Sequence, residues 1–226
     1  MESRHPDITI VLATGNKDKV RELKPVLEGL ASGISVRSLH DLGFDIEVDE
    51  TEPTLEGNAR LKADAIFELV APRLDWFIAL ADDTGLEVDA LGGAPGVFSA
   101  RYAPVPEGAT RTYTDNVRHL LSEMRGKSER TARFRTVIAM KGRLPAPDGG
   151  ALLVDETTDG HIDGVIATEP QGDGGFGYDP VFAPEGMERT FAQLTIDEKN
   201  RISHRGRAVM AAAQRIGEIL SQCEIQ

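Results

Sequence analysis

The pattern of hydrophobic and polar positions divides the chain into short apolar runs, typical of buried strands, and apolar residues three or four apart, typical of helices. Apolar runs predict strands at 8–13, 77–81, 133–140, 152–156 and 161–167. Helical spacing predicts helices over 17–30, 54–70, 116–124 and 203–220. Pro25 lies inside the first helix and should kink or break it. Helices and strands alternate early and strands cluster later, which favours an α/β fold with a mixed sheet.

Glycine and proline mark the connections between these elements. The run 145–150 is predicted to be a surface loop, and glycine-rich segments occur at 92–96 and 172–177. Long glycine loops in a compact domain are usually functional or mobile. The chain contains no internal repeat, so we interpret residues 1–226 as a single domain, with two lobes around a cleft as the expected arrangement.

Composition narrows the class of protein. The chain has 226 residues, of which 40% are hydrophobic and 27% charged, as in ordinary globular proteins. Its net charge of −12 argues against non-specific nucleic-acid binding. Cys223 is the one cysteine, so an internal disulfide framework is impossible and a reducing compartment is expected. The first six residues do not resemble a signal peptide, and no apolar run reaches the length of about 18 residues that a membrane span needs.

Two adjacent acids follow the apolar run 77–81. Asp82 and Asp83 precede Thr84-Gly85, which predicts a strand that ends in a turn. Ligands of open α/β sheets lie at such carboxyl ends. Successive strand side chains point to opposite faces, so the two acids should differ in role. With the acidic segment 47–52 they could hold Mg²⁺, which is usually bound by one or two carboxylates plus substrate phosphates, or act as a general base towards water.

Simpler interpretations exist for these acids. Asp83 could be a turn acid at a strand end, and the segment 47–52 a solvated loop. The hydrophobic-Asp-Thr-Gly pattern also occurs in aspartic proteases, whose chemistry needs two such aspartates sharing a proton. The chain has no second Asp-Thr-Gly, and its helix-rich pattern is wrong for a small all-β protease.

Three further segments could bind an anionic, aromatic ligand. Residues 14–19 follow a strand and open a helix, a junction suited to phosphate, although Asn16 could simply cap that helix. In 174–180 the glycines allow close approach and Phe176 and Tyr178 could stack on a base, unless they plug the core. If Ser203 caps the last helix, the cations that follow it oppose the helix dipole and suggest an anionic or polar ligand. Basic residues gather at 17–24 and 199–207, and acids gather at 47–52 and 82–83. A basic pocket that faces an acidic one is what a metal-bound polyphosphate requires.

Five motifs occur in the order of one known family. They are Thr14–Lys19, Ala81–Leu86, Gly92–Tyr102, Gly174–Pro180 and Ser203–Gly206. On these motifs the chain resembles the inosine/xanthosine triphosphate pyrophosphatases, which act on non-standard purine nucleotides. The resemblance implies Mg²⁺-assisted hydrolysis of inosine, xanthosine and deoxyinosine triphosphates (ITP, XTP and dITP) to the monophosphate and pyrophosphate. It also implies an elongated mixed sheet flanked by helices, a cleft between two lobes, and a cytoplasmic homodimer. From the charge and the apolar runs described above, we expect no nucleic-acid or membrane partner.

Carried over motif by motif, the resemblance assigns roles to individual residues. Asp83 is the proton acceptor and a metal ligand, and Glu50 or Asp49 supplies the second metal carboxylate. The substrate-binding residues are Thr14, Gly15, Asn16, Lys17, Asp18, Lys19, Thr84, Phe176, Gly177, Tyr178, Asp179, Lys199, His204 and Arg205. The run 54–59 departs from the family pattern because its acids are shifted and Leu55 replaces an aromatic residue. No function is assigned to 154–164.

These roles combine into one mechanism. Water attacks the α-phosphorus, Asp83 orients or deprotonates it, and Lys19 and Lys199 stabilise charge on the leaving pyrophosphate. His204 or Arg205 would read the purine 6-oxygen and so disfavour a 6-amino group. Two alternatives remain open: a related enzyme acting on a modified pyrimidine triphosphate, and a nucleotide-binding regulator without catalysis. The intact acid and lysine pairs argue against the regulator.

Overall fold

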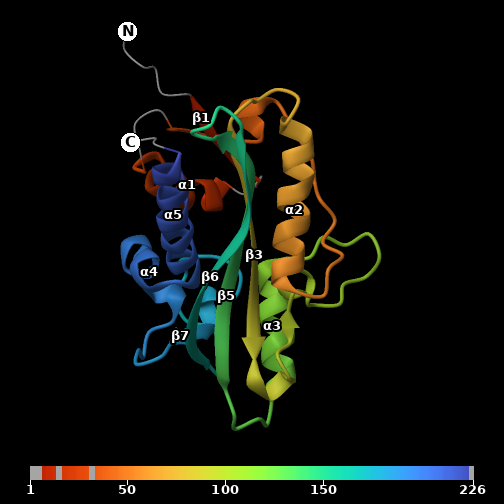
Figure 1. Cartoon of the computed structure of the whole chain (residues 1–226). Helices are drawn as coiled ribbons and strands as arrows, with labels where there is room; N and C mark the ends of the chain where they lie inside the picture. Colours follow the sequence, from red (N-terminus) through yellow and green to blue (C-terminus); the bar gives the residue numbers. More distant parts are fainter. Residues whose placement is uncertain (1–6, 14–16, 31–33, 224–226) are drawn as a thin grey trace. The chain divides into compact units, whose positions relative to one another are not determined.

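Figure 1 shows the computed structural model, which describes residues 7–13, 17–30 and 34–223. Its helices and strands are β1 (Ile8–Leu12), α1 (Lys17–Glu28), β2 (Ile34–Ser38), α2 (Leu55–Val70), β3 (Phe77–Val88), β4 (Pro95–Gly96), α3 (Tyr113–Glu123), β5 (Thr131–Pro145), β6 (Ala151–Ile166), β7 (Phe182–Pro184), α4 (Ile196–Ile202) and α5 (His204–Gln222). The expected phosphate-binding residues Thr14, Gly15 and Asn16 lie outside the described residues.

The strands of the described residues form one mixed sheet in the order β2-β1-β3-β5-β6-β7, with β4 paired to β3. Strand β1 runs parallel to both β2 and β3. The pairs β3–β4 and β6–β7 are antiparallel. The predicted α/β class with a mixed sheet is therefore confirmed.

The chain divides into two compact units, each with its own core. The first takes the described residues up to Asp83, Val137–Asp159 and those from Ala208 onward; the second takes Thr84–Thr136 and Gly160–Arg207. The division falls inside β3, between Asp83 and Thr84. The single domain with a cleft between lobes stays a prediction.

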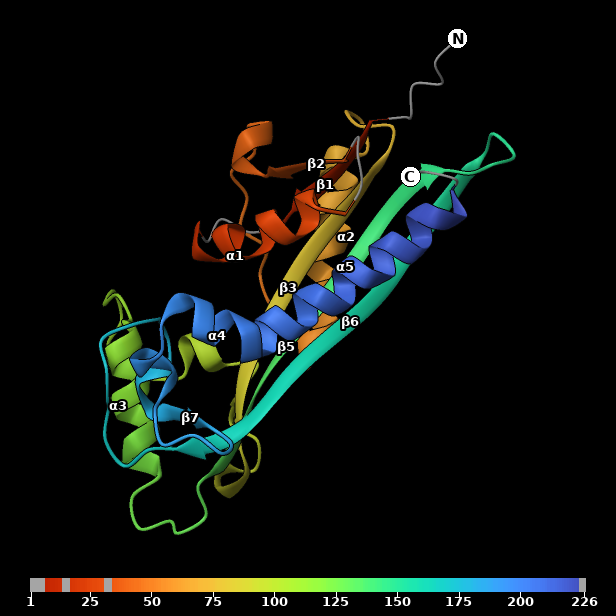
Figure 2. The ribbon, with the colours of Figure 1, turned by 90° about the vertical axis from the view of Figure 1, so that its left-hand side faces the viewer.

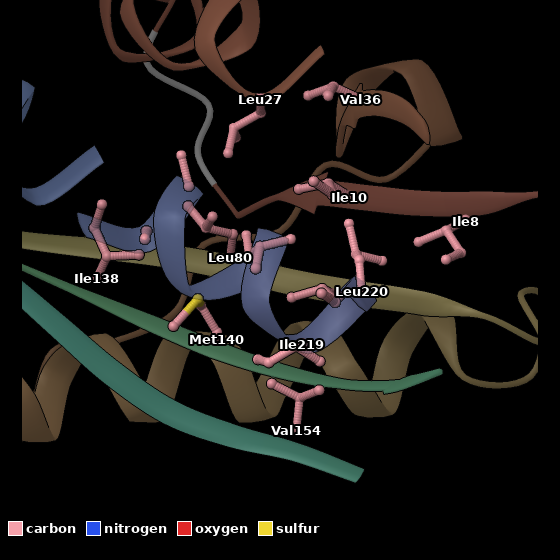
Figure 3. Close-up of a cluster of buried hydrophobic side chains, with 14 of the residues drawn as sticks. Ile8, Ile10, Leu27, Val36, Leu80, Ile138, Met140, Val154, Ile219 and Leu220 are labelled. Atoms are coloured by element: carbon pink, nitrogen blue, oxygen red, sulfur yellow. The ribbon is translucent and has the colours of Figure 1, made fainter. Parts of the chain in front are cut away.

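Both faces of the sheet are covered in the first unit. Ile78 and Leu80 of β3 pack with residues of α1 and α5 in one cluster, part of which Figure 3 shows. Phe77 and Ala79 pack on the opposite face with Ile66 of α2. Figures 1 and 2 show the corresponding arrangement, with α5 on one side of these strands and α2 on the other. The alternation of a strand thus separates two hydrophobic layers.

The second unit has an aromatic core. Phe134 of β5 lies with its ring centroid 4.7 Å from that of Phe182 and 6.1 Å from that of Phe191. Leu86 and Val88, from the second half of β3, belong to the same cluster. This core is important for function because it also supports His204, described below.

Several elements differ from the sequence-based expectation. Strand β3 does not end at Asp82 and Asp83 but continues through Thr84-Gly85 to Val88, so the predicted turn is wrong. The two strands predicted at 152–156 and 161–167 are one long strand, β6. Polar residues within these strands mislead a local reading, because some of them pair with residues distant in sequence: Asp83 pairs with Lys62, Asp155 with Arg60 and Glu156 with Arg215. The loop between β5 and β6 and the four predicted helices are confirmed.

Capping residues explain where the helices begin. The Thr54 hydroxyl accepts a hydrogen bond from Gly57 N at the start of α2, and Thr112 and Asp115 form a capping box at α3. Ser203 Oγ accepts from Gly206 N at the start of α5, which confirms Ser203 as its N-cap. Pro25 lies within α1. None of the helices built from the described residues is long and apolar enough to cross a membrane.

Candidate active site

One largely buried lysine contacts two carboxylates in the first unit. Lys62 Nζ, on α2, lies 2.6 Å from Glu50 Oε1 and 2.8 Å from Asp83 Oδ1. The three side chains are largely buried, with exposed fractions of 14% for Lys62, 23% for Glu50 and 8% for Asp83. We call Lys62, Glu50 and Asp83 the acid–lysine cluster. It lies on the α2 face of β3, and strand alternation places Asp82 on the opposite face.

The first turns of α2 hold the segment that carries Glu50. Asn58 is fully buried, and its Oδ1 accepts a hydrogen bond of 2.9 Å from Glu52 N. A Cβ at Gly57 would lie 2.6 Å from Glu52 Cβ, so only glycine allows this close packing. Lys62 follows Asn58 by four residues and therefore lies on the same helix face.

The acid–lysine cluster holds one ammonium group against two carboxylates. Burial works to lower the pKa of Lys62, but Asp83 and Glu50 outweigh burial and hold that pKa above its usual value. In the part of the chain that the structure describes, no group of three or more His, Cys, Asp or Glu side chains could hold a metal. Two carboxylates suffice for a magnesium ion that also binds substrate phosphates.

The structure distinguishes the two candidates for the second carboxylate. Glu50 contacts Lys62 together with Asp83, whereas Asp49 is exposed. Residues Lys17, Asp18 and Lys19 lie in α1, and the positions of their side chains are not described. The predicted triphosphate-binding role of 14–19 therefore stays a prediction.

Two cations lie over one aromatic ring in the second unit. Lys199 Nζ is 4.9 Å and Arg205 Cζ 5.4 Å from the centroid of Phe176. Asp179 Oδ2 accepts hydrogen bonds from Lys199 Nζ at 2.6 Å and from Phe176 N at 2.8 Å. We call Phe176, Asp179, Lys199 and Arg205 the aromatic–cation cluster. Gly175 is required beside it, because its φ is +69° and a Cβ there would lie 2.0 Å from Asp179 Oδ2.

Two residues of the 174–180 motif, Tyr178 and Asp179, are buried and bind other residues of the protein. Tyr178 is buried in the aromatic core, and its hydroxyl donates a hydrogen bond of 2.9 Å to the carbonyl of Ser99. Asp179 is buried, which raises the pKa of its carboxyl, although Lys199 opposes that shift. Tyr178 thus adopts the core-filling alternative. Phe176 is only partly buried and is the better placed of the two aromatics for a base. Gly177 has a φ of +63°.

His204 begins α5 and ends a chain of hydrogen bonds. Its Nδ1 lies 2.7 Å from Thr136 Oγ1, which lies 2.8 Å from Thr84 Oγ1. The imidazole stacks on Phe134 with a centroid distance of 4.7 Å and an interplanar angle of 19°. The structure thus links two predicted substrate-binding residues, Thr84 and His204, through a third residue.

Sequence reasoning missed Lys62, Asn58 and Thr136. A signal for the first two was available in the predicted helix 54–70. An ordinary helix has an uninterrupted apolar stripe on its inner face, but here the polar residues Asn58 and Lys62 occur four residues apart among the apolar positions of that stripe. Thr136 gave no such signal, since a threonine within a strand is ordinary.

Buried charge of this kind, on a mixed α/β scaffold, is typical of an α/β enzyme with a charged ligand. Comparison with known proteins identifies the family. The model of the Ham1 family matches residues 10–215, and the chain belongs to the Ham1 family.

Named relatives cover almost all of the chain. A dITP/XTP pyrophosphatase of Chlorobaculum tepidum is 86% identical over 226 residues, which is 100% of both chains. One of Bacillus subtilis is 43% identical over 201 residues, covering 88% of this chain and 92% of the relative. A HAM1 protein from Coxiella burnetii has a similar structure, with a TM-score of 0.78 and 34% identity over 93% of this chain and 99% of that one.

Proposed function

We propose that this protein is a nucleoside triphosphate pyrophosphatase that converts ITP, XTP and dITP to the monophosphate and pyrophosphate. The observation that carries the proposal is the acid–lysine cluster, where two carboxylates gather on one buried lysine. The relatives from Chlorobaculum tepidum and Bacillus subtilis are named dITP/XTP pyrophosphatases, which supports dITP and XTP as substrates.

The acid–lysine cluster suits Mg²⁺. Glu50 and Asp83 supply the hard oxygen ligands that a divalent cation such as Mg²⁺ prefers. Once bound there, Mg²⁺ would neutralise charge on the phosphate oxygens. Glu50 is our choice over Asp49, because Glu50 is the carboxylate that shares Lys62 with Asp83.

Asp83 acts as the general base in the proposed reaction. Its carboxylate orients or deprotonates the water that attacks the α-phosphorus. Lys62 donates a hydrogen bond of 2.8 Å to Asp83 Oδ1. Lys19 stabilises the charge that develops on pyrophosphate as it leaves, whereas Lys199, the other lysine expected in this role, lies 2.6 Å from Asp179 and is paired with that carboxylate.

The aromatic–cation cluster supplies recognition of the base. Phe176 stacks on the purine, and His204 or Arg205 donates a hydrogen bond to its 6-oxygen. A 6-amino group would meet that donor with another donor, so ATP should be a poor substrate. Both side chains are buried, which makes the mismatch costly.

Pyrophosphate release from ITP, XTP, dITP, GTP and ATP, with and without Mg²⁺, tests the proposal. We expect turnover of the first three nucleotides, little turnover of ATP, and loss of activity on chelation. Comparable rates with ITP and ATP would contradict base selection and favour an enzyme for another triphosphate. Failure to release pyrophosphate from ITP with Mg²⁺ would favour a regulator without catalysis.

The proposal also covers the oligomeric state, the location and the partners of the protein. As a member of this family it would act as a cytoplasmic homodimer on a small-molecule substrate, without a nucleic-acid or membrane partner. Its charge of −12 supports the absence of non-specific nucleic-acid binding. Light scattering coupled to size-exclusion chromatography tests the dimer; a monomeric mass would contradict it.

A further inference from the structure

Asn58 is a polar side chain on an otherwise apolar buried face of α2. The other buried residues of this helix are Leu55, Ala59, Ala63, Ile66 and Val70. Asn58 is fully buried, and its Nδ2 has no hydrogen-bond partner among the described residues. A buried donor without a partner lowers the stability of a fold, so packing alone would favour an apolar residue here. The asparagine therefore points to a task for its other polar atom, Oδ1.

The task of Oδ1 is to accept a hydrogen bond from the backbone of Glu52. Glu52 N lies 2.9 Å from Asn58 Oδ1. A backbone N–H can only donate, so the oxygen of the amide must face it, and this fixes the orientation of the Asn58 side chain. Nδ2 then points away from Glu52, which agrees with its lack of a partner in the described part of the chain.

The segment that contains Glu52 has no regular structure of its own. In the described structure, no position between Leu42 and Leu55 belongs to a helix or strand, and Glu52 is exposed. Gly57 allows the segment to lie close to α2, because a Cβ there would be 2.6 Å from Glu52 Cβ. The bond to Asn58 and the close contact at Gly57 therefore both fix Glu52 against the first turns of α2.

We propose that Asn58 is a positioning residue: by holding Glu52 on α2, it places the carboxylate of Glu50 in the acid–lysine cluster. Glu50 lies two residues before Glu52, and its Oε1 is 2.6 Å from Lys62 Nζ. Lys62 is one helical turn after Asn58 on the same face, so one rigid helix carries both the residue that holds the segment and the lysine that Glu50 contacts. The placement does not depend on the proposed function; its effect on Mg²⁺ dependence rests on that function.

Amide hydrogen exchange, followed by NMR, tests the hydrogen bond in the unsubstituted protein. An exposed residue outside helices and strands ordinarily exchanges fast. We expect the Glu52 amide to exchange about tenfold more slowly than a free amide, the effect of one hydrogen bond of ordinary net strength. The amide of Thr51, an exposed neighbour, gives the reference rate after correction for intrinsic rates. Exchange of both amides at the free rate would overturn the proposal, and this measurement needs no variant.

Two substitutions separate the oxygen of Asn58 from its amide nitrogen. Asn58→Asp keeps an acceptor for Glu52 N, whereas Asn58→Leu removes it at similar size. We expect the slow exchange of Glu52 to persist in Asn58→Asp and to be lost in Asn58→Leu. Slow exchange that survives in Asn58→Leu would overturn the proposal, because the acceptor would then lie elsewhere.

A double substitution tests whether Asn58 acts through Glu50. We expect Asn58→Leu to raise the Mg²⁺ concentration needed for half-maximal turnover of ITP by about tenfold, the lower end of the effect of groups that orient metal ligands. In a Glu50→Gln background the same change should have little further effect, because residues that act through one contact are not additive. Equal increases in both backgrounds would show that Asn58 does not act through Glu50.

Val70→Ala is the matched control for a general loss of stability. Val70 is a fully buried residue of α2, two turns after Lys62, and packs in the same hydrophobic layer as Phe77. It should lower the midpoint of urea denaturation and leave the half-maximal Mg²⁺ concentration unchanged. A shift as large as that of Asn58→Leu would mean that the Mg²⁺ effect reports instability of α2 alone, and the positioning role would be wrong.

The two kinds of readout separate this inference from the proposed function. If Asn58→Leu abolishes the slow exchange of Glu52, but the unsubstituted protein releases no pyrophosphate with Mg²⁺, the placement of the segment holds and the proposed function fails. If pyrophosphate is released, but Asn58→Leu changes neither the exchange nor the Mg²⁺ dependence, the positioning role is wrong and the proposed function stands.

Discussion

Lys62 and Lys199 differ in the number of carboxylates that they contact, and this number determines whether the surrounding group can also bind a metal ion. Lys62 contacts two acids, Glu50 and Asp83, at 2.6 and 2.8 Å. Lys199 contacts one acid, Asp179, at 2.6 Å. The first lysine is shared by two carboxylates, which are also the hard oxygen ligands that a metal ion prefers. The second lysine forms a neutral pair with a single carboxylate.

The two lysines also differ in the kind of side chain that surrounds them. Lys62 is surrounded by carboxylates that belong to a strand and to the segment docked on α2. Lys199 lies instead over the ring of Phe176 and 5.5 Å from the centroid of Phe191. We interpret the acid–lysine cluster as the chemical centre and the aromatic–cation cluster as a rigid support for the base.

The largest effect should come from the chemical centre. We expect Asp83→Asn to lower kcat for ITP by about a thousandfold, since a general base contributes factors of about 10²–10⁴. Nucleotide binding should remain measurable by calorimetry, because the aromatic–cation cluster is unchanged. Asp89→Asn, on an exposed acid of the second unit, serves as a control. Near-normal turnover of Asp83→Asn would remove Asp83 from the mechanism.

Replacement of Lys199 tests whether its pair with Asp179 stabilises the fold. Lys199→Met leaves Asp179 buried without its cation, which should cost about 3–5 kcal/mol in the free energy of unfolding. Urea denaturation measures this loss. The matched control is Arg189→Met, which breaks the exposed pair with Glu198 and should cost about 0–1 kcal/mol. Equal losses in the two variants would show that Lys199 is not a structural partner of Asp179.

The choice between Glu50 and Asp49 can be decided by a pair of neutral substitutions. We expect Glu50→Gln to raise the Mg²⁺ concentration needed for half-maximal turnover by at least about tenfold, since loss of a residue that only supports a metal ligand already costs about ten- to a hundredfold in affinity. Asp49→Asn should change it little, because that side chain is exposed. A magnesium titration of activity gives both values. The reverse result would place the second carboxylate at Asp49.

The smallest effect should come from the aromatic support. Phe176→Leu removes stacking worth about 1–3 kcal/mol per base and should raise KM by about tenfold. ITP and ATP should be affected alike, because every base has an aromatic face. Phe98→Leu changes an aromatic residue that is 57% exposed and provides the control. A loss confined to ITP would mean that Phe176 takes part in base selection.

Local patterns in the sequence predicted much of the fold. Each predicted helix is present because apolar spacing and capping act over a few residues, as in α2 with Thr54 as its cap. The same patterns placed the end of β3 wrongly at Asp82 and Asp83. A short window cannot include Lys62, which lies 21 residues away in the chain and supplies the charge that allows Asp83 to be buried inside a strand.

The sequence by itself determined the α/β class, the helix positions and the motifs that identify the family, because these depend on short-range spacing. Only the tertiary structure decided that Glu50 rather than Asp49 shares Lys62 with Asp83, that Asp179 is committed to Lys199, and that Thr136 joins Thr84 to His204. Those contacts bridge residues far apart in the chain, and a buried charge or hydroxyl is stable only where the fold provides its partner.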